Sequence, residues 1–357
     1  MTDKEKQPVK FGVIGVGRIA VEAHIPCLRE AGAEIVALAD VAPGRAARFA
    51  AQFSVPGAYD DYRQMLAQPE IDAIAVASPT CAHEENAVAA LLAGKHVYLE
   101  KPPAMNEAQI QRIVEAGRKA GKLLMVGSQS VYQFYTQTLK RFIDAGEMGE
   151  IYFVKCSAAG RRDNPHGWYR RKSVAGGDAA IDGMSHILDR ILYLLGTPKP
   201  VSVTARTYLK FGSYIPRTPY MDMDFAEGRS TDTPVSDCED LAVAFIQFDN
   251  GCTLMVDNAR ASNVPQPGNM WFYGSKAGAC FNPFTIYGET SDGVLTNTTP
   301  VAPNEPAGHT LMFKHFLQCI REGRETQSSG ERAVILMRIV DAIYKSQEAG
   351  GREVILS

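Results

Sequence analysis

The stretch that decides the fold is Val9-Lys10-Phe11-Gly12-Val13-Ile14-Gly15-Val16-Gly17-Arg18-Ile19-Ala20. The short apolar run at its start predicts a buried strand over Val9–Val16. The pattern G-x-G-x-x-A follows and leads into a helical pattern over Ile19–Ala31. In this context Gly15 permits a tight turn and Gly17 lets the backbone approach a pyrophosphate. The helix N-terminus then offers free N–H groups to the phosphates. The stretch therefore predicts a dinucleotide-binding unit.

An acidic residue follows the next predicted strand, Glu34–Ala39. Asp40 lies about 20 residues after Gly17, the spacing expected for an acid that accepts hydrogen bonds from the adenosine ribose. Its charge would repel a 2′-phosphate, which favours NAD over NADP, although Arg45 nearby works against this preference. The alternative is a glycine turn of another α/β protein, in which Asp40 only caps the next helix.

Short apolar runs and helical patterns continue to alternate through the first third of the chain. This alternation predicts a doubly wound parallel sheet, and we assign residues 1–127 to a Rossmann dinucleotide-binding domain. The further predicted strands are Ala73–Ala77, His96–Leu99 and Leu123–Val126, and the further predicted helices are Gly44–Ala51, His83–Ala93 and Glu107–Ala120.

The pattern changes after Gly127. Residues 128–357 predict an α+β domain with a mixed or antiparallel sheet covered by helices, and Asp249-Asn250-Gly251 is a strong hairpin signal. A C-terminal helix of this domain is expected to pack back towards the first domain. Tyr208–Asp237 is rich in Pro, Asp and Thr and predicts a long functional connection. The predicted helices are Tyr135–Ala145, Ala179–Leu195, His309–Glu322 and Glu331–Ala349, and the predicted strands are Ile151–Ala158, Val201–Thr207, Leu241–Phe248, Cys252–Asn258, Asn269–Tyr273 and Glu353–Leu356.

The composition excludes several classes of protein. The chain has 357 residues and a formal net charge of -3, without a dense run of Lys and Arg, so it lacks the footprint of a nucleic-acid-binding protein. No apolar run approaches the roughly 20 residues that span a bilayer, and the first residues lack the apolar segment of a signal peptide. The seven cysteines are scattered and form no Cys-x-x-Cys pair, so we predict no metal site and a reducing, cytoplasmic location.

Two further sites carry residues suited to hydride-transfer chemistry. Lys101 follows a buried strand, at the end where ligands bind in open α/β sheets, but it is equally consistent with a solvated lysine. Asp182 and His186 are four residues apart in a helical pattern and share one face. A neutral histidine can take a proton from an alcohol, and a carboxylate can stabilise the charged ring. The alternative is a capping Asp182 and a buried, structural His186. His309 lacks comparable surroundings.

These stretches together resemble the Gfo/Idh/MocA oxidoreductase family over nearly the whole chain. The matching motifs are Val13-Ile14-Gly15-Val16-Gly17 with Ala20, Ala77-Ser78-Pro79-Thr80 with His83, Ala93-Gly94-Lys95-His96-Val97, Glu100-Lys101-Pro102, Gly146-Glu147-Met148-Gly149-Glu150-Ile151, Gly176-Gly177 with Asp182, His186 and Asp189, and Glu239-Asp240 before Phe248-Asp249-Asn250-Gly251.

The resemblance implies a Rossmann domain, a second domain with a large open sheet, and a homo-oligomer. It implies that Lys101 and His186 contact the reacting hydroxyl, with His186 as general base and Asp182 holding His186 or a substrate hydroxyl. The implied cofactor residues are Gly15, Gly17, Arg18, Ile19, Asp40, Arg45, Ser78, Thr80, His83, Glu100, Lys101 and Gln129.

One stretch departs from the family pattern, and a second stretch carries a cluster of aromatic and arginine side chains. Many relatives carry an arginine pair where this chain has Ser128-Gln129-Ser130-Val131-Tyr132, which removes positive charge near the cofactor. Trp168, Tyr169, Arg170 and Arg171 precede the glycine pair and form an aromatic-and-arginine cluster that suits a sugar ring or aglycone, or equally an interface. We therefore expect an NAD-dependent dehydrogenase of a sugar, cyclitol or glycoside, with sugar C3 oxidation as one option. A redox-neutral glycoside-cleaving enzyme and an inactive NAD-binding sensor stay open.

Overall fold

The structure is a computed structural model that describes residues 7–161, 167–214, 235–264 and 266–356. Within these ranges the chain forms two compact units. The first contains the described residues of 1–132 and 306–334, and the second those of 133–305 and 335–357. The predicted boundary at residues 127 and 128 stays a prediction. No helix in the described ranges is long and apolar enough to cross a membrane.

The first unit is a parallel sheet with the strand order β3-β2-β1-β4-β5-β6 among the described residues. The order runs outward in both directions from β1, so right-handed crossovers place helices on opposite faces of the sheet. The strands are β1 (Lys10–Ile14), β2 (Glu34–Ala39), β3 (Gly57–Tyr59), β4 (Ala73–Val76), β5 (His96–Leu99) and β6 (Leu124–Val126). The helices are α1 (Ile25–Ala31), α2 (Arg45–Phe53), α3 (Tyr62–Leu66), α4 (His83–Leu92), α5 (Glu107–Ala120) and α9 (Gly308–Glu322).

One predicted helix of this unit is wrong in detail. The sequence predicts continuous α-helix over Ile19–Ala31, but Ala20–His24 is a π-helical turn and α1 begins only at Ile25. Pro26 stands at the start of α1, where its missing N–H costs no hydrogen bond. The π-turn gives His24 a fully buried side chain. Such turns are frequent at functional sites.

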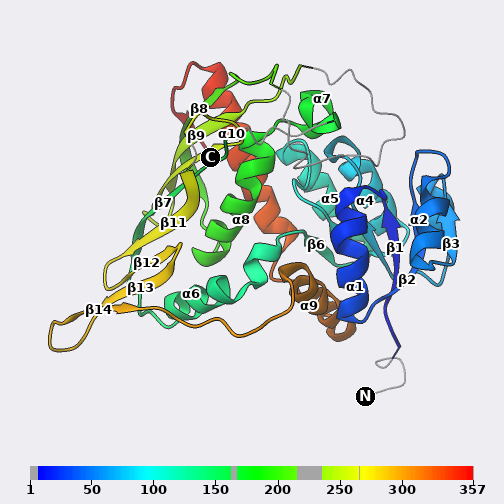
Figure 1. Cartoon of the computed structure of the whole chain (residues 1–357), viewed down its shortest axis with the longest axis horizontal. Coiled ribbons are helices and arrows are strands. Elements are labelled where there is room, and N and C mark those ends of the chain that lie inside the picture. Colours follow the sequence, from blue (N-terminus) through cyan, green and yellow to red (C-terminus); the bar gives the residue numbers. More distant parts are fainter. Residues whose placement is uncertain (1–6, 162–166, 215–234, 265, 357) are drawn as a thin grey trace. The chain divides into compact units, whose positions relative to one another are not determined.

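The second unit is built on a mixed sheet, with the order β14-β13-β12-β11-β7-β10-β9-β8-β15 in the described part of the chain. β7 and β10 pair in parallel, and the other neighbours pair antiparallel. Helices α6 and α8 lie along one face of this sheet (Figure 1). The strands are β7 (Ile151–Ala159), β8 (Pro200–Tyr208), β9 (Leu241–Phe248), β10 (Thr253–Ala259), β11 (Gln266–Gly274), β12 (Gly278–Phe281), β13 (Phe284–Glu289), β14 (Leu295–Thr298) and β15 (Val354–Ile355). The helices are α6 (Phe134–Asp144), α7 (Lys172–Ala175), α8 (Met184–Leu194) and α10 (Gly330–Glu348), of which α10 begins in the first unit.

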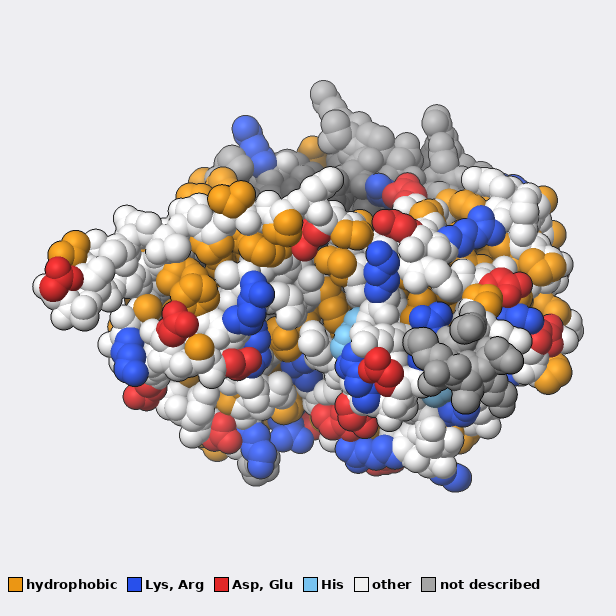
Figure 2. All heavy atoms as spheres, turned by 90° about the horizontal axis from the view of Figure 1, so that it is seen from below, with side chains coloured by type: hydrophobic (Ala, Val, Ile, Leu, Met, Phe, Trp, Pro, Cys, Tyr) orange, Lys and Arg blue, Asp and Glu red, His pale blue; other side chains and the backbone are white. Residues whose placement is uncertain are grey.

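The structure confirms the fold class that the sequence predicts. The predicted hairpin at residues 249–251 joins β9 and β10, which pair antiparallel. The sequence analysis did not predict β12, β13 and β14, of which β14 is mostly exposed and so lacks a buried apolar face. Residues 215–234, most of the predicted long connection, lie outside the described residues. On the face shown in Figure 2, acidic and basic side chains are interspersed among the described residues.

Candidate active site

The glycine loop after β1 has the geometry that a dinucleotide needs. Gly15 has a φ of 88°, and a Cβ added to it would lie 2.6 Å from the backbone nitrogen of Ser78. Only glycine fits there without strain. A Cβ added to Gly17 would meet nothing within 4 Å, so the chain leaves open space beside this residue. This combination of a tight turn and an open approach fits the pyrophosphate of NAD.

Asp40 connects the glycine loop to the end of β2. Its Oδ2 accepts the backbone N–H of Val16 at 2.8 Å, and its Oδ1 accepts that of Ala42 at 2.9 Å. Arg45 Nη1 lies 3.6 Å from Oδ1 and offsets part of the negative charge. The side chain is therefore fixed at the carboxyl edge of the sheet with Arg45 beside it, and the effect of this pair on the choice between NAD and NADP stays a prediction.

The residues after β4 position a neighbouring loop. His83 is buried, with its Nδ1 2.9 Å from the carbonyl oxygen of Pro102 and its Nε2 2.7 Å from that of Ser78. Burial lowers the pKa of His83, although both carbonyl oxygens favour a protonated ring. Ser78 Oγ also accepts from Asn86 at 2.8 Å, and Thr80 is buried at the start of a short turn. His83 thus ties the loop after β4 to the segment that carries Lys101.

Lys101 is held at the same edge by Glu100, the first residue after β5. Glu100 Oε2 accepts the backbone N–H of Lys101 at 2.9 Å, and Oε1 accepts from the Tyr98 hydroxyl at 2.7 Å and from His24 Nε2 at 2.9 Å. Burial would raise the pKa of Glu100, but His24, Lys101 and Tyr98 together lower it well below its usual range. These bonds give Glu100 a positioning role, and its direct contact with a cofactor stays a prediction.

The sequence analysis missed two residues of this network. The first residue is His24, which is fully buried. Because the Glu100 carboxylate can only accept a hydrogen bond, we assign the ring proton to His24 Nε2. His24 Nδ1 has no partner among the described residues. The second residue is His309, for which the sequence indicated no notable surroundings. One possible ligand atom from each of His309, His24 and Glu100 lies within 4.8 Å of the other two. Histidine and carboxylate are metal-ligand types. Glu100 Oε1 already accepts hydrogen bonds from His24 and Tyr98, and His309 contacts His24 through the rings, with centroids 6.1 Å apart, so we interpret the cluster as a packed polar core and not as a metal site.

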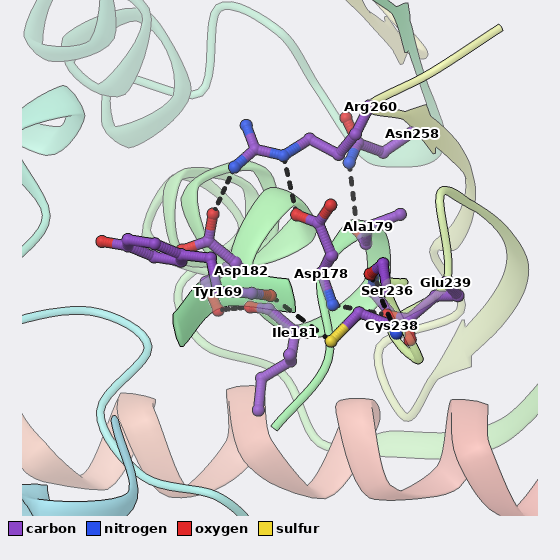
Figure 3. A network of polar contacts seen from close by, with 12 residues as sticks. Tyr169, Asp178, Ala179, Ile181, Asp182, Ser236, Cys238, Glu239, Asn258 and Arg260 are labelled. Atoms are coloured by element: carbon purple, nitrogen blue, oxygen red, sulfur yellow. Dashed lines mark hydrogen bonds and ion pairs between the residues drawn. The ribbon is translucent and has the colours of Figure 1, made fainter. Parts of the chain in front are cut away.

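In the second unit, the predicted acid Asp182 belongs to a buried ion-pair network (Figure 3). Arg260, at the end of β10, donates from Nε to Asp178 at 2.8 Å and from Nη2 to Asp182 at 2.7 Å. Both carboxylates are buried. Burial, with the charges of Asp182 and Glu239 nearby, raises the pKa of Asp178 to about 7 in spite of Arg260. Neither Arg260 nor Asp178 was identified from the sequence.

The turn that carries Asp182 is shaped by Asn258. Residues Ala179–Gly183 form a π-helical turn that continues into α8, and Asn258 Nδ2 donates to the carbonyl oxygen of Ala179 at 3.0 Å. A Cβ added to Gly183 would lie 2.0 Å from Asn258 Nδ2, which explains the glycine. His186 is half-buried in the first turn of α8, four residues after Asp182. The shared helix face that the sequence predicts therefore starts in a π-turn.

Of the predicted substrate residues, Arg170 is almost completely buried. Its Nη1 donates to the carbonyl oxygen of Tyr214 at 3.1 Å and its Nη2 to that of Gly212, and burial lowers its pKa. These contacts indicate a structural role for this guanidinium. Trp168 is half-buried and stacks on Tyr169 with ring centroids 3.7 Å apart.

The remaining predicted cofactor residues lie in the first unit. Arg18 forms a 2.7 Å ion pair with Glu22 on the exposed side of the π-helical turn Ala20–His24. Ile19 is the N-cap residue of that turn. Gln129 opens a short 3₁₀ turn, Gln129–Tyr132, after β6. The structure thus brings Gly15, Asp40, Ser78 and Lys101 to the carboxyl ends of parallel strands of one sheet, where ligands bind in folds of this type.

Comparison with known proteins agrees with this geometry. The chain is 30% identical over 351 residues to the D-glucoside 3-dehydrogenase of Escherichia coli K12, covering 97% of each chain. It is 27% identical over 269 residues to the myo-inositol 2-dehydrogenase of Thermotoga maritima, covering 75% of this chain and 73% of that one. Levoglucosan dehydrogenase in complex with NADH has a similar fold, with a TM-score of 0.84 and 21% identity over 98% of this chain and all of the other.

The family profiles cover both parts of the chain. Residues 9–128 match the NAD-binding Rossmann fold of the Gfo/Idh/MocA oxidoreductase family, and residues 140–355 match its C-terminal alpha/beta domain. The open loop at Gly17 and the placement of Asp40 fit the same cofactor. The chain therefore belongs to the Gfo/Idh/MocA family of oxidoreductases, and residues 9–128 form its NAD-binding domain.

Proposed function

We propose that the protein is an NAD-dependent dehydrogenase of a secondary hydroxyl on a sugar, cyclitol or glycoside, with the C3 hydroxyl of a glucoside as the first candidate. The observation that supports this most is that Glu100 fixes the backbone of Lys101 at the sheet edge that also carries the glycine loop. NAD, when bound, accepts or donates the hydride. The names of the glucoside and inositol dehydrogenases support a CH–OH substrate.

His186 takes the hydroxyl proton in this proposal, and Lys101 opposes the negative charge that develops on that oxygen. Asp182 lies four residues before His186, and a carboxylate there favours the charged ring once the proton has moved. Arg260 keeps this carboxylate paired and fixed in direction. The proposed cofactor residues are those of the sequence analysis, Gly15, Gly17, Arg18, Ile19, Asp40, Arg45, Ser78, Thr80, His83, Glu100, Lys101 and Gln129.

The test is formation of reduced nicotinamide, followed by its absorbance, with purified protein, NAD and a panel of free sugars, cyclitols, sugar acids and glycosides. We expect an increase with one class, and losses of about 100-fold or more in kcat/KM for His186→Ala and Lys101→Met. Lys119→Met, on the exposed surface of α5, is the matched control and should keep full activity.

Two other outcomes separate the competing functions. Consumption of a glycoside without net formation of reduced nicotinamide would replace this proposal with a redox-neutral glycoside-cleaving enzyme. NAD binding with no turnover of any member of the panel would favour a sensor. Identical turnover in wild type and His186→Ala would remove His186 from the chemistry.

We also propose a homo-oligomer that forms through the face of the mixed sheet opposite α6 and α8. Phe245 pairs with Met255, Met255 pairs with Lys155, and Lys155 pairs with Trp271, so these side chains share one face. Phe245 is 43% exposed and Met255 37% exposed. Exposed apolar side chains on one face of an open sheet are typical of an interface between subunits.

A further inference from the structure

A cavity of about 380 Å³ lies within the second unit, between the sheet and the two helices that cover it. This volume suits a small ligand or part of a larger one. The cavity is lined by residues of α6, α8, β7 and β11 and by the end of β12, and no Asp or Glu is among them. The lining residues that matter for its chemistry are Thr136, Cys156, Ile187, Arg190 and Phe281.

Arg190 gives the cavity a positive charge, and it has no ion-pair partner among the described residues, although the charge of Asp189 acts on it. The guanidinium lies over the ring of Phe281, with its central carbon 5.2 Å from the ring centroid. Its Nη2 donates to Gln133 Oε1 at 3.2 Å, but its buried Nε has no partner. No carboxylate of the described residues forms an ion pair with it, and burial lowers its pKa. A partly buried, unpaired cation is costly, so an anion in the cavity would be favoured.

A second donor in the same cavity lacks a partner. Thr136 is 1% exposed, and its Oγ1 forms no hydrogen bond in the described part of the chain. Cys156 adds no competing negative charge, because burial raises the pKa of its thiol to about 12. The walls of the cavity therefore hold two unpartnered buried donors, and the cavity remains cationic. Its best ligand is a group that carries several acceptor oxygens and one negative charge.

Two residues of α8 that line the cavity lie close in sequence to the proposed base. Ile187, the residue after His186, lines the cavity, and Arg190 is four residues beyond His186 on the same face of α8. Four residues of α-helix span about 6 Å along the axis. A single substrate can therefore present a hydroxyl near His186 and a charged substituent near Arg190.

We propose that this cavity is a subsite for the carboxylate of an acidic sugar, such as a uronic acid glycoside, with Arg190 as the residue that selects it. The carboxylate accepts from the guanidinium of Arg190 and from the hydroxyl of Thr136. The aromatic ring of Phe281 supports the flat guanidinium from the other side. The proposal deepens the proposed function, since it names the substrate class on which that function rests.

Isothermal titration calorimetry on the full chain, with NADH present so that the hydroxyl probes cannot be oxidised, tests the subsite. The probes are methyl β-D-glucuronide and methyl β-D-glucoside, which differ at C6. We expect the wild type to bind the glucuronide at least about 10-fold more tightly than the glucoside. Arg190→Met should reduce this ratio about 10-fold, to near 1, as expected for loss of a charged hydrogen bond. Arg190→Lys should keep part of it, and Arg141→Met, on exposed α6 surface, should keep all of it.

A wild type that binds both probes equally overturns the proposal, and so does an Arg190→Met protein that keeps the ratio. Glucose 6-phosphate is a third probe, and tighter binding of it than of the glucuronide would also overturn the choice of a carboxylate. Thr136→Val replaces Arg190→Met if the latter fails to fold, and it should lower the ratio to a smaller extent. Because binding is measured without turnover, failure of the dehydrogenase assay leaves this result interpretable by itself.

Discussion

Replacing Arg260 by Met should destabilise the second unit in a pH-dependent way. The substitution removes the cation that pairs with Asp178 at 2.8 Å and with Asp182 at 2.7 Å, and leaves both carboxylates buried. Loss of one partner of a buried pair costs about 3–5 kcal/mol. The Arg260 side chain is 18% exposed, so we expect the lower end, about 3 kcal/mol. That is roughly a 100-fold lower folding constant, or a Tm lower by about 6–12 °C.

The sign of the pH effect follows from the raised pKa of Asp178, about 7 in the folded protein. In the unfolded chain an aspartate has a pKa of about 3.9, so the folded state binds more protons between the two values. Stability therefore falls as pH rises through this window. Without Arg260 both carboxyl groups are harder to ionise, and the fall becomes steeper.

The assay is urea unfolding of Arg260→Met and wild type at about pH 5 and about pH 8, within and above this window. The loss of stability should be smaller at the lower pH, where Asp178 is protonated. Arg112→Met, which breaks the exposed pair with Glu84, is the matched control and should cost less than about 1 kcal/mol. An equal loss at both pH values, or one no greater than that of the control, would refute the reasoning.

Three further predictions concern other parts of the molecule. Gly15→Ala should lower the free energy of unfolding by more than about 1 kcal/mol, because the added Cβ would lie 2.6 Å from the backbone nitrogen of Ser78. Gly17→Ala should keep the free energy of unfolding and lose NAD affinity. Thermal unfolding with and without NAD distinguishes the two variants, and equal behaviour of both contradicts the loop geometry. Glu100→Gln should cost about 1–3 kcal/mol near neutral pH. Because the folded pKa of Glu100 is lowered, the difference from wild type should shrink as pH falls below the usual glutamate range in urea titrations, and a constant difference contradicts its role. Phe245→Glu should convert the homo-oligomer to monomers in light scattering after gel filtration; an unchanged mass would move the interface elsewhere.

The relation between Arg190 and the proposed base also bears on how substrate specificity arises in this protein. His186 lies in the first turn of α8 and Arg190 in the next, so one rigid helix fixes their separation. A site on a helix is held more accurately than one on a loop. Specificity for the charged group would then depend on one side chain and its aromatic support.

Much of the fold follows from the sequence by itself, because its signals are local. The G-x-G-x-x-A pattern after an apolar run requires a tight turn at Gly15, and the positive φ there agrees. The helix Glu107–Ala120 and the strand Leu241–Phe248 were predicted to the residue. Asn106 caps the start of the helix and Gly121 follows its end, while the Asp249-Asn250-Gly251 turn follows the strand. Lys101, Asp182 and His186 were likewise proposed as catalytic residues from motifs, and their roles stay proposals.

The tertiary structure alone decided how the buried charges are paired. Glu100 is hydrogen-bonded to His24, 76 residues away in the sequence, and Arg260 is hydrogen-bonded to Asp178, 82 residues away. No local pattern relates such residues, because each pair forms only when separate elements pack together. The π-helical turn before α8 has the same origin, since Asn258 shapes it from a distant strand. The sequence therefore determined which elements form and which residues have reactive side chains, while packing determined which of those side chains are paired and which, like Arg190, are left with a free donor.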